Sequence, residues 1–169
     1  MAGAIRPPQE APAAGQGPTL RRGRPEEADA LWVLRTRCVR ELCSAAYPPE
    51  VIAPWAASPP PAHYRDLIGQ GGCIVAEDDA GTLLGYGVID QQGNEIDALF
   101  VDPDCGGRGI GSVLMHALQA LADPTRPLLL SASLNAVPFY LRAGFKPLRE
   151  ESYPHPSGVA LASVRMQRG

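Results

Sequence analysis

The sequence predicts a single α/β (α+β) domain in which helices flank a mixed, mostly antiparallel sheet. Its length of 169 residues lets one domain bury a substantial core without disulfides or metals. Apolar segments with a helical period alternate with short apolar runs bounded by turn residues. Three of these runs follow one another closely, as the strands of an antiparallel meander do. No internal repeat interrupts this order.

Charge and composition narrow the class of protein. The chain has 15 Lys and Arg against 18 Asp and Glu, and this acidic balance argues against nucleic acid as a partner. No apolar run approaches the ~20 residues of a membrane helix, so no membrane partner is expected. The 4 cysteines show no C-x-x-C spacing and no secretory signal precedes them. The cysteines therefore predict reduced thiols in a cytoplasmic protein without a metal site. The sequence leaves open whether the protein forms a homodimer.

Residues 1–18 differ in composition from the rest of the chain. They consist mainly of Ala, Pro, Gly and Gln, and Arg6 and Glu10 are their only charged side chains. Such a segment has too little bulky apolar surface to offset the entropy cost of ordering. We therefore expect a disordered arm at 1–18 and a folded domain at 19–169.

The first half of the folded part predicts one strand followed by helices. Pro25, Glu26 and Glu27 suit a first helical turn, because proline fits there and the helix dipole favours acids. Apolar residues then recur at spacings of three and four until Tyr47 and two prolines end the helix. We interpret the later prolines as punctuation of two short helices. The expected elements are a strand at 19–21, a helix over 25–45, and helices at 51–57 and 63–69.

The second half predicts the sheet. Three apolar runs that end in turn residues form the meander, and Gly144 ends the last helix. The expected elements are strands at 73–77, 83–90 and 95–101, a helix over 109–121, a strand at 127–131, a helix over 135–143, and strands at 145–153 and 159–167.

The segment 99–112 carries the strongest functional signal. It places four glycines within six residues, between a strand and a helix. Glycine lets backbone N–H groups approach a ligand, and a helix N-terminus favours an anion, most often a phosphate. The segment is not a P-loop, because no Gly-Lys-Ser/Thr triplet occurs. It is not a dinucleotide fingerprint either, because Leu114 stands at the third glycine position.

Two motifs together resemble the GNAT N-acetyltransferase superfamily. Val101-Asp102-Pro103 followed by Gly107-Arg108-Gly109-Ile110-Gly111 is similar to the family's acetyl-CoA loop. The segment from Ser133 to Phe145 is similar to its second signature, N-x-x-A-x-x-F-Y-x-x-x-G-F. Gly106 stands where the loop usually has Arg or Gln, and Ser133 stands where the signature has Asn. The element order suits the family from about Thr19 to the C-terminus.

The resemblance implies a fold, a reaction and a co-substrate. The sheet would splay at an acetyl-CoA site, and the enzyme would move acetyl from acetyl-CoA to a primary amine of a small molecule or peptide by direct attack. The alternative is a non-catalytic acyl-CoA-binding module of the same fold. The cofactor-binding residues that the resemblance implies are Leu99, Phe100, Val101, Gly106, Gly107, Arg108, Gly109, Ile110, Gly111, Ser112 and Asn135, with Ser133 as the alternative to Asn135.

Acetyl transfer to an amine calls for a base on the acceptor side and an acid near the sulfur. By motif position the acid is Tyr140, whose hydroxyl can hydrogen-bond to the departing thiolate and protonate it. The favoured base is Glu95, because relatives with a glutamate base on this strand carry it at the same interval before the loop. The alternation of side chains along a strand predicts that Asp97, Leu99 and Val101 lie on the same strand face as Glu95. Asp97, or a base acting through water, therefore stays open.

A few aromatic and histidine side chains lie in regions that border the acceptor pocket in the family. We expect Tyr47, Trp55 and Tyr64 to pack the two short helices, with the option that one of them lines the pocket. His155 lies in the last hairpin loop, and the sequence assigns no role to His63.

Overall fold

The computed structural model describes residues 17–155 and 158–169. The arm expected at 1–18 therefore lies outside the described residues, apart from its last two positions. The strands are β1 (Thr19–Arg22), β2 (Cys73–Glu77), β3 (Leu83–Asp90), β4 (Glu95–Val101), β5 (Leu128–Ser133), β6 (Lys146–Pro154) and β7 (Ala160–Arg168). The helices are α1 (Ala28–Leu42), α2 (Pro49–Ala57), α3 (His63–Gly69), α4 (Ile110–Leu121) and α5 (Val137–Arg142), with 3₁₀ turns η1 (Pro25–Glu27), η2 (Cys43–Ala45), η3 (Pro103–Cys105) and η4 (Leu134–Ala136).

These elements match the predicted ones closely: β2, β3 and β4 have the predicted bounds, the other strands differ from them by one or two residues, and the larger differences lie at helix ends. The helix expected over 135–143 divides into η4 and α5, with Pro138 in the first turn of α5. Proline lacks an N–H group, so it fits the start of a helix better than its interior. The helix expected over 25–45 likewise has a 3₁₀ turn at each end.

The strands of the described residues form one seven-stranded sheet in the order β1-β2-β3-β4-β5-β7-β6. Within it only β4 and β5 are parallel, and α4 makes the crossover between them. The meander of β2, β3 and β4 is antiparallel, as predicted. The mixed, mostly antiparallel sheet is thus confirmed.

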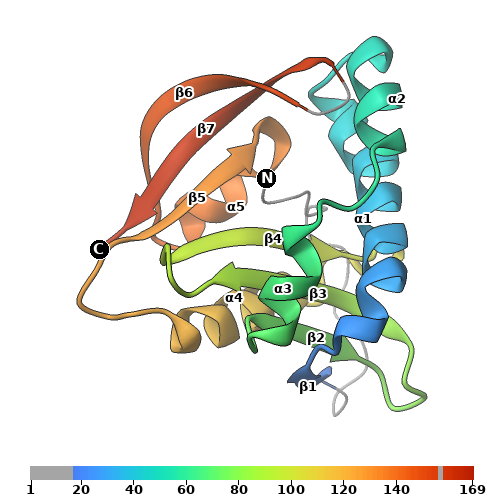
Figure 1. Ribbon diagram of the computed structural model, residues 1–169, viewed down its shortest axis with the longest axis vertical. Coiled ribbons are helices and arrows are strands. Elements are labelled where there is room, and N and C mark those ends of the chain that lie inside the picture. Colours follow the sequence, from blue (N-terminus) through green and yellow to red (C-terminus); the bar gives the residue numbers. More distant parts are fainter. Residues whose placement is uncertain (1–16, 156–157) are drawn as a thin grey trace.

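The sheet opens between its two parallel strands. Positions 95–96 of β4 pair with 129–130 of β5, and no further pairs join these two strands. Beyond that point β4 continues beside β3 as far as Val101, while β5 continues beside β7 as far as Ser133. Figure 1 shows β5, β6 and β7 diverging from the plane of β1 to β4. The splay that the resemblance implied is present.

Helices cover both faces of the β1–β4 part of the sheet (Figure 1). On one face α1 and α3 pack through apolar side chains such as Leu31 and Ile68. On the other face α4 packs through Leu114 and Leu118, which are fully buried. Gly87 of β3 permits the close approach of α4, because a Cβ atom there would lie 2.5 Å from Cδ1 of Leu118.

A β-bulge in β4 changes which residues face α1 and α3. Consecutive residues of β3 pair with Ala98 and Ile96, so that Asp97 is the extra residue. Asp97 and Ala98 consequently line the same cavity, whereas Leu99 and Val101 pack with Ile96 on the α4 face. The expectation that Leu99 and Val101 share a face with Asp97 is wrong, because the bulge shifts the alternation of the strand.

The cysteines behave as small buried groups. All four are free thiols, and Cys38, Cys43 and Cys73 are buried. Burial raises the pKa of the Cys43 and Cys73 thiols to about 12, so these groups stay protonated at neutral pH. In the part of the chain that the structure describes, no group of three His, Cys, Asp or Glu is placed to hold a metal ion. No helix there is long and apolar enough to cross a membrane.

Candidate active site

The glycine-rich loop between β4 and α4 forms a cavity of about 240 Å³. Gly107 and Gly109 have φ angles of 80° and 74°, a region that favours glycine because a Cβ atom crowds the backbone there. Gly109 is the N-cap of α4, and a Cβ atom built on it would meet nothing within 4 Å. The space above this glycine is therefore open to a ligand. The lining residues are Val101, Cys105, Gly106, Gly107, Gly109, Ile110, Gly111, Ser112, Phe139 and Arg142.

The electrostatics of this cavity favour an anion. The first N–H groups of α4 have no acceptor inside the helix, and the helix dipole adds partial positive charge. Arg142 is the one arginine among the lining residues, and Arg108 does not line the cavity. The carboxylate of Asp102 fixes the loop, because it accepts hydrogen bonds from the Asp104 N–H at 2.8 Å and from Nη1 of Arg37 at 3.0 Å.

The remaining residues of the predicted cofactor set lie where the sheet opens. Leu99 and Phe100 belong to the end of β4 that pairs with β3 alone. Asn135 lies in η4, directly after β5, and its buried Oδ1 has no hydrogen-bond partner among the described residues. The side chains of Ser133 and Asn135 lower the pKa of the Cys43 thiol, against the larger effect of burial. Asn135 thus retains an acceptor atom at the opening of the sheet.

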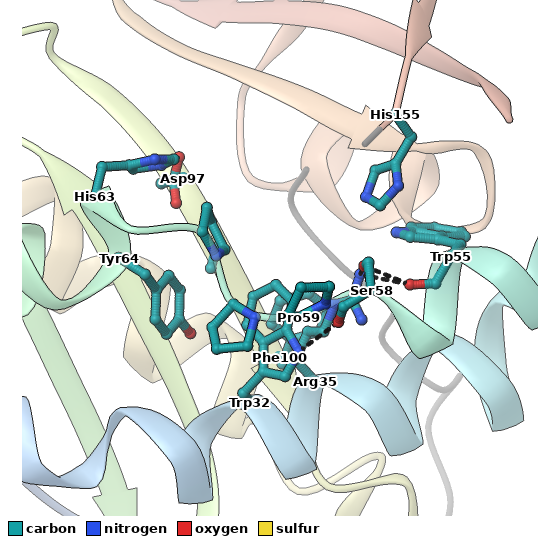
Figure 2. Close-up of a pocket in the computed structure, with 13 residues that line it drawn as sticks. Trp32, Arg35, Trp55, Ser58, Pro59, His63, Tyr64, Asp97, Phe100 and His155 are labelled. Carbon is teal, nitrogen blue, oxygen red and sulfur yellow. Dashed lines mark hydrogen bonds and ion pairs between the residues drawn. The ribbon is translucent and has the colours of Figure 1, made fainter. Parts of the chain in front are cut away.

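A second cavity, of about 410 Å³, lies between β4, the helices α1 to α3 and the β6–β7 hairpin (Figure 2). Aromatic rings and prolines make most of its wall, and the Pro-rich linker between α2 and α3 closes one side. The lining residues are Trp32, Arg35, Trp55, Ser58, Pro59, Pro60, Pro61, His63, Tyr64, Asp97, Ala98, Phe100 and His155. We call this the acceptor cavity.

His63 and Asp97 meet at one wall of the acceptor cavity (Figure 2). Nε2 of His63 lies 3.9 Å from Oδ1 of Asp97. The bulge in β4 aims Asp97 into the cavity, and the first residue of α3 brings the imidazole to it. An imidazole beside a carboxylate is a common arrangement for moving a proton.

Glu95, in contrast, lies outside the acceptor-cavity lining and belongs to an ion pair. Its carboxylate accepts hydrogen bonds from Nη1 of Arg165 at 2.5 Å and from Nη2 at 3.3 Å. Arg165 of β7 also donates to the hydroxyl of Ser131 in β5 at 3.1 Å. This hydrogen bonding raises the pKa of Arg165. The three side chains link β4, β5 and β7 at the closed end of the splay.

Tyr140 is fully buried in the core between α5, β5 and β6, and its ring packs edge-on against Phe139 and Phe145. Its hydroxyl has no hydrogen-bond partner among the described residues. Burial raises the pKa of Tyr140, which keeps the phenol protonated. A phenol in this state is a hydrogen-bond donor without an acceptor.

Some of the aromatic residues near the acceptor cavity line it, and others pack behind the residues that line it. Trp55 and Tyr64 line the cavity, together with His155 of the hairpin loop. Tyr47 does not; it packs edge-on against Trp55 at 5.1 Å and donates a hydrogen bond to the Ala162 carbonyl. The sequence predicts that Tyr47, Trp55 and Tyr64 pack the two short helices, and the contact of Tyr47 with Trp55 confirms this for Tyr47. Trp55 and Tyr64 also line the cavity.

Comparison with known proteins agrees with this arrangement. Residues 43–158 match the family model of the acetyltransferase (GNAT) domain, and the chain belongs to this family. It is therefore an N-acetyltransferase by class.

One curated relative supports the assignment, and two solved structures share the fold. The peptidyl-lysine N-acetyltransferase YjaB of Salmonella typhimurium is 29% identical over 130 residues, which cover 75% of this chain and 82% of that protein. The GCN5-related N-acetyltransferase from Rhodopseudomonas palustris has a TM-score of 0.76 at 24% identity, over 94% of this chain and 99% of that one. The PaiA N-acetyltransferase from Thermoplasma acidophilum, solved with coenzyme A, has a TM-score of 0.63 at 18% identity, over 90% and 98% of the two chains.

The sequence analysis did not single out Trp32, Arg35 and His63, which line the acceptor cavity. A signal for Arg35 was present, because it follows Leu31 by four residues and so lies in the apolar stripe of its helix. An arginine in such a stripe is unusual enough to mark a site. His63 had no comparable signal, since only the fold places it beside Asp97.

Proposed function

We propose that this acetyltransferase moves the acetyl group of acetyl-CoA to the primary amine of a small molecule or peptide in the acceptor cavity. The observation that carries the proposal is the position of the open end of β4. This strand end supplies Val101 to the glycine-loop cavity and Asp97, Ala98 and Phe100 to the acceptor cavity. A donor and an acceptor in the two cavities would meet there, as direct transfer requires.

The residues around the glycine loop suit acetyl-CoA, which supplies a thioester-bound acetyl group when it is bound. We assign the pyrophosphate to the backbone N–H groups of 106–112 and to Arg142. We assign the pantetheine arm to the edge of β4 at 99–101, which β5 leaves without a strand partner. The buried Oδ1 of Asn135 suits an N–H donor of this arm.

On the acceptor side, we assign the proton transfer to His63 and Asp97. The amine nitrogen loses its proton to the imidazole of His63 while it forms a bond to the acetyl carbonyl carbon. The carboxylate of Asp97, 3.9 Å from Nε2 of His63, stabilises the resulting positive charge. Glu95 as the base is the competing assignment, and its bidentate contact with Arg165 makes it the less favourable of the two.

On the donor side, the carbon–sulfur bond breaks and the sulfur leaves as a thiolate. We assign its stabilisation to the hydroxyl of Tyr140, which is buried and has no acceptor among the described residues. Because burial raises the pKa of Tyr140, the phenol acts as a hydrogen-bond donor to the thiolate and keeps its proton.

Thiol release from acetyl-CoA, measured against a panel of amines and lysine peptides, tests the proposal. We expect release that depends on the amine and that yields a stoichiometric amount of N-acetylated product. CoA binding without turnover of any amine or peptide would contradict the proposed function and favour the acyl-CoA-binding module.

Three substitutions separate the candidate bases. Asp97→Asn and His63→Gln should lower kcat/KM by about 100-fold or more and change the acidic limb of the pH–rate profile. Glu95→Gln should keep the shape of the profile, and Asp79→Asn, in the exposed β2–β3 turn, is the matched control. An altered profile for Glu95→Gln beside a normal one for Asp97→Asn would assign the base to Glu95.

A further inference from the structure

Two acids lie immediately before the glycine loop. Asp102 caps the 3₁₀ turn η3, and Asp104 belongs to that turn. Their neighbours Val101 and Cys105 line the glycine-loop cavity, whereas the two acids do not. Oδ1 of Asp102 accepts a hydrogen bond from the Asp104 N–H at 2.8 Å, so one tight turn holds both carboxylates. Two negative charges thus stand beside the site that we assign to a pyrophosphate.

The charge of these acids reaches the cavity wall. Burial raises the pKa of the Cys105 thiol, and the negative charges of Asp102 and Asp104 raise it further, against the opposite effect of Arg108. Because Cys105 lines the glycine-loop cavity, an anion bound there would be exposed to the same two negative charges. Charges within about 8 Å of each other are only partly screened at physiological salt. Without compensation, the two acids would oppose the binding of a pyrophosphate.

Arg37 of α1 compensates both acids. Its Nη1 donates to Oδ2 of Asp102 at 3.0 Å, and its Nη2 donates to Oδ2 of Asp104 at 3.4 Å. The same Nη2 lies 3.5 Å from Oε2 of Glu41, one helical turn further along α1. The hydrogen bond with Asp102 raises the pKa of Arg37, and the Asp102 side chain is only 17% exposed. The closer contact is therefore with the more buried of the two loop acids.

We propose that Arg37 is a positioning residue for acetyl-CoA: its charge, paired with Asp102 and Asp104, keeps these acids from repelling the pyrophosphate. Arg37 does not line the glycine-loop cavity, so it acts through the two carboxylates. This inference rests on the proposed function, because it concerns the same pyrophosphate site. It differs from a purely structural role, in which Arg37 only ties α1 to η3. A structural role predicts no dependence on the charge of the donor substrate.

Acetyl-CoA and S-acetylpantetheine separate the two roles, because S-acetylpantetheine has the thioester but no pyrophosphate. Arg37→Met removes the charge and keeps a side chain that suits a helix. We expect this variant to lower kcat/KM about 5- to 10-fold for acetyl-CoA and less than about twofold for S-acetylpantetheine. An equal loss with both donors would overturn the inference, as would no loss with acetyl-CoA. Arg40→Met, at an exposed position of the same helix, is the matched control.

Calorimetry with CoA tests the charge itself. Arg37→Met should weaken CoA binding by about 5- to 10-fold, and the loss should shrink at about 0.5 M NaCl, because salt screens the exposed acids. Adding Asp102→Asn to Arg37→Met removes one of the uncompensated charges, while the asparagine oxygen can still accept the Asp104 N–H. This double variant should bind CoA within about threefold of the parent. A double variant that binds CoA as weakly as Arg37→Met would overturn the inference.

Arg37→Lys is the conservative variant, because it keeps the charge and lacks the planar fork. It should bind CoA within about threefold of the parent. A loss of about 5- to 10-fold would instead show that the bridging geometry matters and the charge does not, which would overturn the inference. If Arg37→Met does not fold, as judged by circular dichroism, Arg37→Lys decides alone.

The same measurements separate failure of the inference from failure of the proposed function. Absence of turnover with every amine contradicts only the proposed reaction, because CoA binding by the variants still decides the role of Arg37. Turnover that Arg37→Met leaves unchanged overturns only the inference. An unmodified enzyme that uses acetyl-CoA no better than S-acetylpantetheine contradicts the pyrophosphate site and the role of Arg37 together.

Discussion

Replacing Tyr140 by Phe should make the enzyme more stable and slower. The substitution removes one hydroxyl that is fully buried and has no hydrogen-bond partner among the described residues. Burying an unsatisfied hydroxyl costs about 1–3 kcal/mol, so the free energy of unfolding should rise by about 1 kcal/mol or more. For a domain of this size, about 1 kcal/mol corresponds to a rise of about 2–4 °C in Tm.

The same substitution should lower kcat by about 10- to 1000-fold with little change in CoA affinity. Because burial raises the pKa of Tyr140, the hydroxyl stays protonated across the accessible pH range. The rate should therefore fall by the same factor at each pH, and the pH–rate profile should keep its shape. Thiol release measures the rate, and thermal unfolding followed by circular dichroism measures the stability.

Tyr86→Phe is the matched control. Tyr86 is also fully buried, but its hydroxyl accepts a hydrogen bond from Tyr64 at 2.5 Å. Removing a satisfied hydroxyl should lower the stability by about 1 kcal/mol, the opposite sign to Tyr140→Phe. A Tyr140→Phe enzyme that is less stable than the parent and turns over at the parent's rate would refute both parts of the reasoning.

Two further predictions concern the glycine loop and the edge of the sheet. Gly109→Val should weaken CoA binding at least tenfold, as measured by calorimetry. Valine disfavours a φ of 74°, and its side chain would enter the open space above the loop. Unchanged affinity would exclude this loop as the pyrophosphate site. The hydrogen bond from Arg21, at 2.7 Å, lowers the pKa of Glu27 to about 2, so the pair stabilises the fold above about pH 4.5 and loses that effect as the pH falls toward 2. Glu27→Gln should lower the free energy of unfolding by about 1 kcal/mol at neutral pH and flatten acid unfolding in that window. An unchanged acid-unfolding curve would show that the pair contributes nothing.

The order of the elements could be predicted from the sequence because it depends on local signals. Strands β2, β3 and β4 begin and end at the predicted residues, since each apolar run stops at turn residues. The loop glycines were also recognisable, because a strand, four glycines and a helix start follow one another directly. The turn residues lie directly beside the strand ends that they set, and the glycines lie within the loop that they form.

The bulge at Asp97 could not be predicted, because it depends on how two strands pair. Two successive residues of β3 pair with Ala98 and Ile96, and nothing in β4 alone specifies that offset. A regular strand would have turned Leu99 and Val101 to the side of Asp97. The bulge instead lets an acid enter the acceptor cavity while those apolar residues stay in the core under α4.

The opening of the sheet is maintained by contacts between distant parts of the chain. Two strands that diverge inside a protein leave backbone groups that need other partners. At the end of β4, the Val101 carbonyl accepts a hydrogen bond from the Cys38 thiol of α1 at 3.2 Å. After the end of β5, the Leu134 N–H donates to the Tyr47 hydroxyl at 3.0 Å.

The closed end of the splay is held by Glu95, which reaches Arg165 of β7 across β5. The same carboxylate that motif spacing favours as the base is thus placed to fix where the strands part. Glu95→Gln should for this reason lower the Tm clearly and change kcat little. Asp97→Asn should lower kcat clearly and change the Tm little. Those two variants then distinguish a residue that shapes the site from one that acts on the substrate. The spacing of the two acids along one strand cannot predict which is which.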